Sequence, residues 1–286
     1  DFEKNISSKV KRLIISTKMQ LTNKTVLITG GASGIGKIMV RLCLERKAKV
    51  IIWDINQTGI DNTIAEFKKL GEISGFAVDV SNPTQIEETA QKVKQEIGFV
   101  DVIINNAGVI VGKYFHEHSS DEIDKTMAIN ANAPMYITKA FLDDMLQKNT
   151  GHICNIASSG GLISNPKMAV YVASKWSLIG WSDSLRVEMK QLKKNIKVTT
   201  IMPYYINTGM FDGVKSSKIK ILEPEAASLT IIKAIEKNKK MSTIPGYLYR
   251  FVKIGQATMS INLFDWFAGS ALGIYKTMDA FTGRKK

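Results

Sequence analysis

The sequence predicts an α/β fold built on a doubly wound parallel sheet, and three observations lead to this prediction. From residue 24 onward, short runs of β-branched apolar residues alternate with longer amphipathic stretches. The short runs contain almost no polar residues, which is typical of strands buried on both faces. No repeat, low-complexity tract or Pro/Gly-rich linker interrupts the 286 residues. We therefore expect a single domain over residues 21–286, preceded by an extension over residues 1–20.

Each element follows from its own stretch of sequence. The expected strands span residues 26–29, 50–53, 75–79, 100–105, 152–157 and 198–201, with a short seventh strand at 242–244. The expected helices span residues 35–47, 59–70, 83–97, 121–146, 168–193 and 225–236. Pro83 suits the first turn of its helix because a polar cap, Ser81-Asn82, precedes it. A substrate loop is expected over residues 204–222, where it can cover a ligand at the carboxyl ends of the strands.

Composition and charge exclude some classes of protein. A chain with 44% hydrophobic and 23% charged residues is a folded globular protein and not a disordered tail. The net charge of +13 favours acidic neighbours, but no nucleic-acid-binding motif accompanies it, so no nucleic-acid partner is expected. No segment reaches the roughly 18 apolar residues of a spanning helix. Cys43 and Cys154 are expected to be free core thiols in a reducing compartment. We expect a cytoplasmic protein that can also lie peripherally at a membrane surface.

A glycine-rich turn joins the first strand to the first helix. Gly30, Gly34 and Gly36 have the spacing G-x-x-x-G-x-G, with Ser33 and Ile35 between them. Glycines at these positions permit a tight turn, and the N-terminus of the helix that follows offers unpaired N–H groups to an anion. The turn therefore predicts a site for the pyrophosphate of a dinucleotide. The alternative is a glycine-rich turn that binds no ligand.

An acidic residue ends the second expected strand. Asp54 lies 18 residues after Gly36, where a carboxylate can accept hydrogen bonds from the adenine-ribose hydroxyls. The same charge repels a 2′-phosphate, and neither Ser33 nor Ile55-Asn56 supplies a cation to hold one. We therefore expect NAD as the cofactor, with NADP disfavoured. The alternative is a solvated carboxylate at a strand end.

A tyrosine and a lysine share one face of the helix at 168–193. Tyr171 and Lys175 are four residues apart, and a nearby ammonium group can lower the pKa of a tyrosine toward the range of acid–base catalysis. Ser158 lies 13 residues upstream at the carboxyl end of the fifth strand, on the side of the sheet that holds the glycine turn. All three side chains can meet one substrate oxygen. The alternative is a core tyrosine beside a surface lysine.

Taken together, these motifs resemble one enzyme family. The matching residues are Thr29, Gly30, Gly34 and Gly36 in the turn, Asp79-Val80 after the third strand, Asn105-Asn106-Ala107-Gly108 after the fourth, Asn130 in the next helix, Ser158, Tyr171 and Lys175. In this order and spacing, the chain is similar to the classical short-chain dehydrogenases/reductases over about residues 22–245. The resemblance implies a Rossmann-type sheet of about seven strands in the order 3-2-1-4-5-6-7.

The resemblance also implies roles for individual residues. Tyr171 would be the general acid/base, Lys175 would bind the nicotinamide ribose and lower the tyrosine pKa, and Ser158 would polarise the substrate oxygen. Asn130 would hold a water in a proton relay. The remaining cofactor contacts would be Asp79 and Val80 at adenine, Asn106, Ala107 and Gly108 along the adenosine, and Pro203, Ile206 and Thr208 near the carboxamide. The expected reaction is hydride transfer between NAD(H) and an alcohol or carbonyl substrate.

One departure concerns the substrate pocket. The family commonly has Pro-Gly after the sixth strand, whereas Pro203 is followed by Tyr204-Tyr205. Two aromatic rings are therefore expected near the nicotinamide, where they would reshape the pocket. Residues 151–158, 204–210 and 278–284 resemble the retinol and 17-beta-hydroxysteroid dehydrogenase subgroup, which implies an apolar alcohol or ketone substrate. The aromatic, basic segment 245–286 is expected to be a lid, an oligomer contact or a membrane contact.

Other readings remain open on the sequence alone. An NADP-dependent carbonyl or 3-oxoacyl reductase is the alternative enzyme, and a catalytically idle cofactor-binding or membrane-docking protein is the alternative of another class. The family usually pairs the helices at 121–146 and 168–193 across a two-fold axis, which implies a homodimer or homotetramer. His116 and His118 lack a third ligand at useful spacing, so no metal site is expected.

Overall fold

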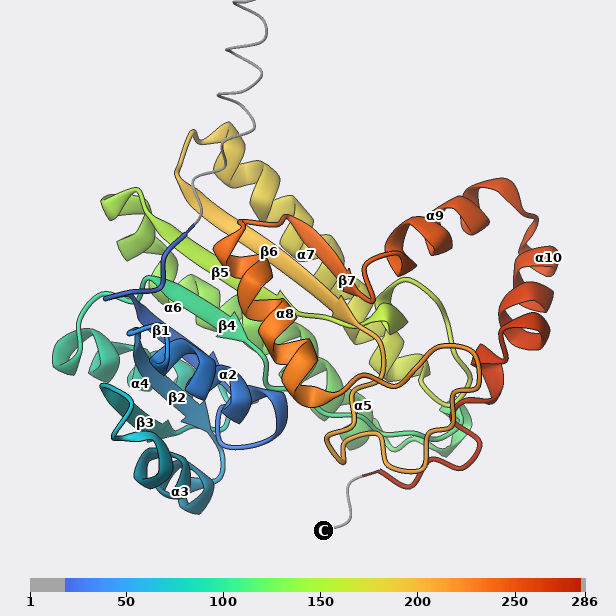
Figure 1. Cartoon of the computed structure of the whole chain (residues 1–286), viewed down its shortest axis with the longest axis horizontal. Coiled ribbons are helices and arrows are strands. Elements are labelled where there is room, and N and C mark those ends of the chain that lie inside the picture. Colours follow the sequence, from blue (N-terminus) through green and yellow to red (C-terminus); the bar gives the residue numbers. More distant parts are fainter. Residues whose placement is uncertain (1–18, 284–286) are drawn as a thin grey trace, which may run out of the picture.

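The computed structural model describes residues 19–283, and its centre is a seven-stranded parallel sheet between two layers of helices (Figure 1). The strands are β1 (Thr25–Thr29), β2 (Lys49–Asp54), β3 (Ile73–Ala77), β4 (Val102–Asn105), β5 (Gly151–Ile156), β6 (Ile196–Pro203) and β7 (Met241–Ile244). Their order across the sheet is β3-β2-β1-β4-β5-β6-β7. This confirms the predicted doubly wound α/β class and strand order.

Two strands differ from prediction by two residues at both ends: β6 is longer than the predicted 198–201, and β3 is displaced along the chain. β3 spans Ile73–Ala77, so it begins and ends two residues earlier than the predicted range 75–79. As an edge strand, β3 pairs only with β2, in a register that joins Ile73 to Val50 and Ala77 to Asp54. The partner strand therefore sets its limits, and Asp79 falls in the turn beyond them.

Helices cover both faces of the sheet. The main ones are α2 (Gly34–Leu44), α3 (Gln57–Phe67), α4 (Pro83–Glu96), α6 (Ala133–Lys148), α7 (Ala169–Gln191) and α8 (Pro224–Glu236). Residues of α2, α3 and α8 pack in one core cluster, and residues of α4, α6 and α7 pack in a second. All β1 side chains are buried, because both faces of the sheet are covered. Cys43 and Cys154 lie in the first cluster as free thiols.

The helix predicted over residues 121–146 is interrupted. The structure has α5 (Ser120–Met127), a π-helical turn (Ala128–Asn132) and then α6. Pro134 lies in the first turn of α6 and has no N–H, so it cannot bond the carbonyl of Asn130 four residues before it. The break therefore has a cause in the sequence, and Asn130 lies within it.

Two helices were not predicted. α9 (Leu248–Thr258) and α10 (Ile261–Trp266) project from the end of β7 as an arm, which we call the α9–α10 arm (Figure 1). The buried residues of α9 are Leu248, Val252 and Gly255, which have the spacing of one helical face. The chain then returns toward the substrate loop, where Thr282 donates to the carbonyl of Asp212.

Of the extension predicted over residues 1–20, residues 1–18 lie outside the described residues. Met19 donates its N–H to the carbonyl of Glu236 at 2.7 Å and packs against the first core cluster. Met19 is therefore in contact with the domain. Arg284, the last residue of the family-like ending, also lies outside the described residues.

Candidate active site

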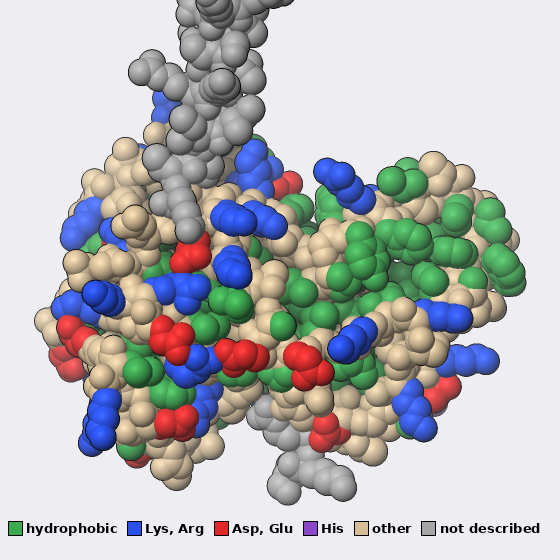
Figure 2. Space-filling model, viewed as in Figure 1, with side chains coloured by type: hydrophobic (Ala, Val, Ile, Leu, Met, Phe, Trp, Pro, Cys, Tyr) green, Lys and Arg blue, Asp and Glu red, His purple; other side chains and the backbone are tan. Residues whose placement is uncertain are grey.

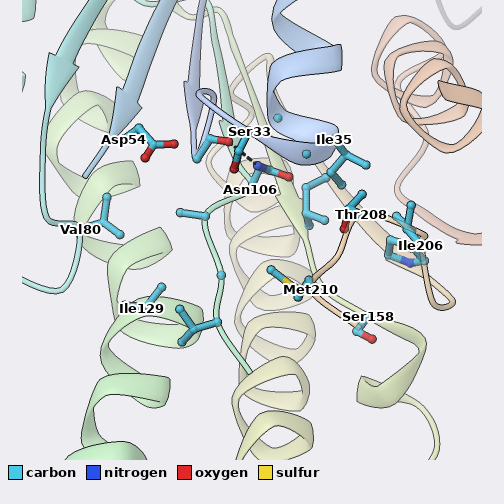
Figure 3. A pocket seen from close by; sticks show the side chains of 18 of the residues that line it. Ser33, Ile35, Asp54, Val80, Asn106, Ile129, Ser158, Ile206, Thr208 and Met210 are labelled. Atoms are coloured by element: carbon cyan, nitrogen blue, oxygen red, sulfur yellow. Dashed lines mark hydrogen bonds between the residues drawn. The ribbon is translucent and has the colours of Figure 1, made fainter. Parts of the chain in front are cut away.

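A cavity of about 290 Å³ opens at the carboxyl ends of the strands, where the topology reverses between β1 and β4. The sequence-predicted residues that line it are Gly30, Ser33, Gly34, Ile35, Gly36, Asp54, Asp79, Val80, Asn106, Ala107, Gly108, Ser158, Tyr171, Lys175, Pro203, Ile206 and Thr208. Figure 3 shows Asp54 and Val80 at one end of this cavity and Ser158, Thr208 and Met210 at the other. The structure thus brings the two predicted halves of the site together.

Several lining residues were not predicted from the sequence. They are Trp53, Ile55, Val78, Val109, Ile129, Ile156, Ala157, Met210 and Phe211. Most are neighbours of predicted residues, but their side chains are apolar and carry no motif. Only their place next to Asp54, Gly108 or Ser158 could have suggested them.

The glycine turn has a shape that other residues could not adopt. A Cβ on Gly36 would lie 1.9 Å from the carbonyl oxygen of Gly30, well inside van der Waals contact. Gly30 and Gly34 have φ angles of +66° and +54°, in the left-handed region. These glycines let the chain turn from β1 into α2 with its backbone exposed to the cavity.

Asn106, which follows β4, holds this turn in place. Its Nδ2 donates to the carbonyl oxygens of Thr29 and Gly30 at 3.0 and 3.3 Å. The N–H groups of Asn106 and Ala107 both donate to Thr29 Oγ1 at 3.0 Å. The turn and the segment after β4 therefore form one wall of the cavity.

The N-terminus of α2 is suited to an anion. Ser33 is the N-cap residue, yet its hydroxyl makes no capping hydrogen bond, and no acidic residue lies in the first turn. The first N–H groups of an α-helix have no partner within the helix and carry partial positive charge. Together with the exposed glycine backbone, they form a cradle that fits a pyrophosphate.

Asp54 lies at the end of β2, beside the glycine turn. Its Oδ2 accepts from the N–H of Ala32 at 3.0 Å, and its Oδ1 accepts from the N–H of Asn56 at 3.1 Å. Each oxygen keeps a lone pair for another donor. Lys175, at the opposite end, is the one Lys or Arg among the lining residues of the described chain.

Asp79 and Val80 lie beyond β3 at the same end of the cavity. Asp79 Oδ1 accepts from both the N–H and the hydroxyl of Ser81, at 2.9 and 2.7 Å. Its N–H donates to Gln85 Oε1 at 2.9 Å. These bonds fix the turn that presents the Val80 side chain to the cavity.

Ser158, Tyr171 and Lys175 converge at the other end. Burial raises the pKa of Tyr171 to about 12, and a hydrogen bond with the Ser158 side chain opposes that shift. Burial lowers the pKa of Lys175 to about 8. Lys175 Nζ donates to the carbonyl of Ile156 at 3.0 Å and lies 5.7 Å from the centroid of the Tyr171 ring.

The direction of the Tyr171 shift corrects one expectation. The YxxxK spacing predicts a tyrosine pKa lowered by Lys175, whereas the tyrosine pKa is raised. The physical reason is burial of the hydroxyl, which disfavours tyrosinate, combined with a lysine that donates to the backbone of β5 and not to the tyrosine.

Asn130 lies behind the cavity wall and does not line it. Its Oδ1 accepts from the N–H of Val109 at 2.9 Å, and its Nδ2 donates to the carbonyl of Val109 at 2.8 Å and to Ser174 Oγ at 3.1 Å. A Cβ placed on Gly108 would lie 3.3 Å from Asn130 Oδ1 and 3.6 Å from Lys175 Nζ. Asn130 therefore anchors the segment after β4 close to the lysine.

The two tyrosines after Pro203 have different surroundings. Tyr204 lines the cavity, but Tyr205 does not. The Tyr205 hydroxyl accepts from Asn165 Nδ2 at 2.9 Å and lies 3.0 Å from Thr277 Oγ1, in a buried polar cluster. Only one of the two rings after Pro203 therefore borders the cavity, because buried partners hold Tyr205 away from it.

Comparison with known proteins decides the family. The family model for short chain dehydrogenase matches residues 24–218. The chain belongs to the short-chain dehydrogenase/reductase family. The alignment with mouse 17-beta-hydroxysteroid dehydrogenase 13 is 34% identical over 245 residues, 85% of this chain and 81% of that one. Human estradiol 17-beta-dehydrogenase 11 is 36% identical over 243 residues, 84% and 81% of the two chains.

Further relatives agree on the subgroup and the fold. Mouse epidermal retinol dehydrogenase 2 is 32% identical over 280 residues, 96% of this chain and 90% of that one. These relatives place this short-chain dehydrogenase/reductase in the retinol and hydroxysteroid dehydrogenase-like subgroup. A family member from Burkholderia phymatum in complex with NAD has a TM-score of 0.77 at 21% identity, over 84% of this chain and 95% of that one. A metagenomic short-chain oxidoreductase in complex with NADP has a TM-score of 0.67 at 26% identity, covering 79% of this chain and 96% of that one.

The fold and relatives support a nicotinamide cofactor and an oxidoreductase activity for this short-chain dehydrogenase/reductase. Within residues 19–283, no cluster of three or more His, Cys, Asp or Glu side chains is arranged to hold a metal ion. None of the described helices is both long and apolar enough to cross a bilayer.

Proposed function

We propose that this protein oxidises an apolar alcohol with NAD, or catalyses the reverse reduction, and that Tyr171 is its acid/base. The observation that carries the proposal is one cavity with the glycine turn and Asp54 at one end and Ser158, Tyr171 and Lys175 at the other. A dinucleotide laid along this cavity would have its pyrophosphate at α2 and its reactive ring near Tyr171. Bound there, it would supply hydride transfer, and the side chains would supply orientation and proton transfer.

The protonation states suit both directions of the reaction. With a pKa of about 12, Tyr171 is protonated at neutral pH and can donate to a carbonyl oxygen. Lys175, with a pKa of about 8, is largely charged at pH 7, so its ammonium can stabilise a tyrosinate if it turns away from Ile156. Ser158, hydrogen-bonded to Tyr171, is placed to bind the same substrate oxygen.

A path for the proton is offered by the break between α5 and α6. Pro134 cannot donate to the carbonyl of Asn130, so this carbonyl lacks its usual helical donor and can accept a hydrogen bond from a water. We propose that this water connects Lys175 to solvent. Asn130 itself would be a positioning residue, since its Nδ2 donates to Val109 and Ser174 and its Oδ1 accepts from Val109.

The choice of NAD over NADP rests on charge. Asp54 is the acidic residue at the ribose end, and the lining there contains no Lys or Arg among the described residues. A 2′-phosphate would lie against a carboxylate with no cation to offset it. An NADP-dependent carbonyl or 3-oxoacyl reductase is therefore the less favoured enzyme.

An apolar substrate is supported by the residues around the catalytic end. Phe211 packs edge-on against Tyr171, with ring centroids 6.1 Å apart, and Met210 and Tyr204 complete this part of the wall. Retinol and steroid dehydrogenases are among the relatives, by name. Both observations favour an apolar alcohol or ketone over a small polar one.

Turnover of an alcohol panel tests the proposal. Purified protein would be offered NAD or NADP with retinoid, steroid, long-chain and small polar alcohols while nicotinamide absorbance is followed. Tyr171→Phe should abolish turnover and leave NADH affinity within about twofold, since general acid–base catalysis contributes about 10²–10⁴-fold to the rate. Substantial residual activity in Tyr171→Phe would refute its role. Silence of the native chain throughout, with NADH still bound, would favour a catalytically idle protein.

The α9–α10 arm supports peripheral membrane contact as a further proposal. Large apolar side chains gather on its surface, including Ile254, Ile261 and Trp266, the last two 80% and 60% exposed (Figure 2). Arg250 and Lys253 lie on the same arm and can meet anionic headgroups. We propose a cytoplasmic protein that lies against membranes through this arm.

Co-sedimentation with anionic liposomes at low salt tests membrane contact. Replacing Ile254, Ile261 and Trp266 with serine should reduce the bound fraction several-fold. Leu70→Ser is the matched control, because Leu70 is a half-exposed apolar residue on the distant α3 side. Failure of the native chain to co-sediment would refute the proposal.

A homodimer or homotetramer is proposed through α6 and α7. Tyr136, Trp176 and Val187 are exposed apolar residues on these two helices. A two-fold pairing would cover them. Sedimentation analysis of Trp176→Glu should show dissociation if the proposal holds.

A further inference from the structure

A small apolar chamber lies beneath the α9–α10 arm, apart from the catalytic cavity. Its volume is about 20 Å³. The arm and the turn after it contribute Val252, Phe264 and Ala268, and the substrate loop contributes Ile219. This volume could hold one water at most, but a water needs polar partners, and the walls are almost entirely apolar.

The chamber and the catalytic cavity share one lining side chain among the residues that the structure describes. Among residues 19–283, Tyr204 alone lines both the catalytic cavity and the chamber. The two spaces also adjoin at the end of β5, where Ser158 lines the cavity and the next residue, Ser159, lines the chamber. The chamber therefore adjoins the part of the cavity where Ser158 is expected to bind the substrate oxygen.

The hydroxyl of Tyr204 is held by Ser216, a residue farther along the same loop. The hydroxyl of Ser216 donates to the carbonyl of Ile219 at 2.6 Å, so the Tyr204 hydroxyl, 2.9 Å away, is the donor to Ser216. The Tyr204 ring also packs edge-on against Tyr205, with centroids 4.7 Å apart. One hydrogen bond and one ring contact thus hold the ring where it borders both spaces.

The roof of the chamber is thinly attached. α9 buries only Leu248, Val252 and Gly255, the last of them against Phe264 of α10, and α10 buries no residue. A side-chain hydrogen bond, from Gln256 Nε2 to the carbonyl of Leu162 at 2.8 Å, ties α9 to the body. Segments with few buried apolar contacts open locally at a lower free energy than the core does. The arm can therefore move outward and enlarge the chamber without unfolding of the sheet.

The other end of the catalytic cavity is not free for a long substrate. The residues from Gly30 to Gly108 form the wall proposed for the dinucleotide, which leaves the space bounded by Ser158, Tyr171, Tyr204 and Phe211. An alcohol whose oxygen meets Ser158 and Tyr171 must therefore extend its chain past Tyr204 or into solvent. Water disfavours an apolar chain, so the chamber is the better place.

We propose that Tyr204 is a gate, and that the chamber behind it binds the hydrocarbon chain of a primary or secondary alcohol. The Tyr204 hydroxyl leaves Ser216, the ring turns, and the chain passes beneath the α9–α10 arm while its oxygen stays at Ser158. Tyr204 is thereby the residue that determines preference for chain length. This inference rests on the proposed alcohol dehydrogenase activity.

A series of primary alcohols from four to ten carbons tests the gate. Both kcat/KM with NAD and calorimetric affinity would be measured, since calorimetry requires no turnover. Each methylene buried in the chamber is expected to improve affinity about fourfold. Tyr204→Phe, which removes the bond to Ser216, should raise the ratio of kcat/KM for decan-1-ol to kcat/KM for butan-1-ol about fivefold.

A variant that fills the chamber provides a second test. Ala268 is fully buried in its wall, and Ala268→Val adds two methyl groups there. Affinity and kcat/KM for decan-1-ol should fall about fifteenfold, the value of two displaced methylenes, while butan-1-ol changes little. Ala257→Val adds the same volume at an exposed position of α9 and should change neither alcohol.

The outcomes separate the two proposals. Equal changes for butan-1-ol and decan-1-ol in both variants would overturn the gate, as would a native affinity that does not depend on chain length. If no alcohol is oxidised with either nucleotide, the proposed reaction fails, but calorimetric binding still decides whether the chamber holds the chain. Thermal unfolding of each variant shows whether a loss comes from misfolding.

Discussion

Replacing Asp54 with asparagine tests whether this carboxylate selects NAD. The change keeps the shape of the side chain and removes its charge. Of the two N–H groups that Asp54 now accepts, from Ala32 and Asn56, one would face the new NH₂ group. The turn should persist, because Asn106 holds it independently through Thr29 and Gly30.

The magnitude follows from the lost hydrogen bonds to the ribose. A hydrogen bond to a charged group contributes about 1.5–3 kcal/mol, so Asp54→Asn should weaken NADH binding about 10- to 150-fold. The affinity for NADPH should stay the same or rise, because the carboxylate no longer repels the 2′-phosphate. The dissociation constant for NADPH divided by that for NADH should therefore fall at least about tenfold.

The assay is equilibrium binding of NADH and NADPH, followed by nucleotide fluorescence. Asp79→Asn is the matched control, since Asp79 lines the adenine end of the same cavity and adenine is common to both nucleotides. It should change both dissociation constants by one factor. If Asp54→Asn also weakens NADH and NADPH equally, the carboxylate supports the turn and does not select the cofactor.

Three other changes have expected outcomes. Gly36→Ala puts a Cβ 1.9 Å from the carbonyl oxygen of Gly30 and should weaken NADH binding at least about 100-fold in a fluorescence titration. Gly180→Ala is the control, because its Cβ would meet no neighbouring atom within 4 Å, and it should leave NADH affinity unchanged. Burial lowers the pKa of His152 to about 3, so below pH 6.5 the unfolded state takes up a proton that the folded state refuses. Stability should therefore fall about 1.4 kcal/mol per pH unit between 6.5 and 3, and denaturation curves of His152→Gln should lack this slope. Tyr205→Phe should cost about 1–3 kcal/mol of unfolding free energy, because the buried Asn165 amide loses one of its two acceptors, whereas Tyr136→Phe should stay within about 0.5 kcal/mol. Equal stabilities of the two variants would contradict a structural role for the cluster.

The sequence predicted the sheet well because its signals are local. Runs such as 50–53 are apolar on both faces, and the glycine turn, Asp54 and the YxxxK spacing each occupy a few neighbouring residues. The break at Asn130 could also have been predicted, since Pro134 removes a helical N–H four residues later. The α9–α10 arm was missed because it has apolar residues on an exposed face as well as on its buried one.

Properties that depend on burial were beyond the sequence. The YxxxK motif predicts a lowered Tyr171 pKa, but the desolvation that raises it depends on every element around the hydroxyl. The opposite surroundings of Tyr204 and Tyr205 are likewise decided by partners far along the chain, Ser216 for one and Asn165 with Thr277 for the other.

By itself, the sequence determined the fold class, the strand order that its family implies and the identity of the groups that meet at the strand ends. These depend on side-chain pattern and on topology, which places all carboxyl ends of parallel strands at one edge. Only the tertiary structure decided the protonation of Tyr171 and Lys175, the orientation of the two tyrosines and the existence of a chamber beneath the arm. Each of these depends on which atoms exclude water from a given point, and that is a property of packing between distant segments.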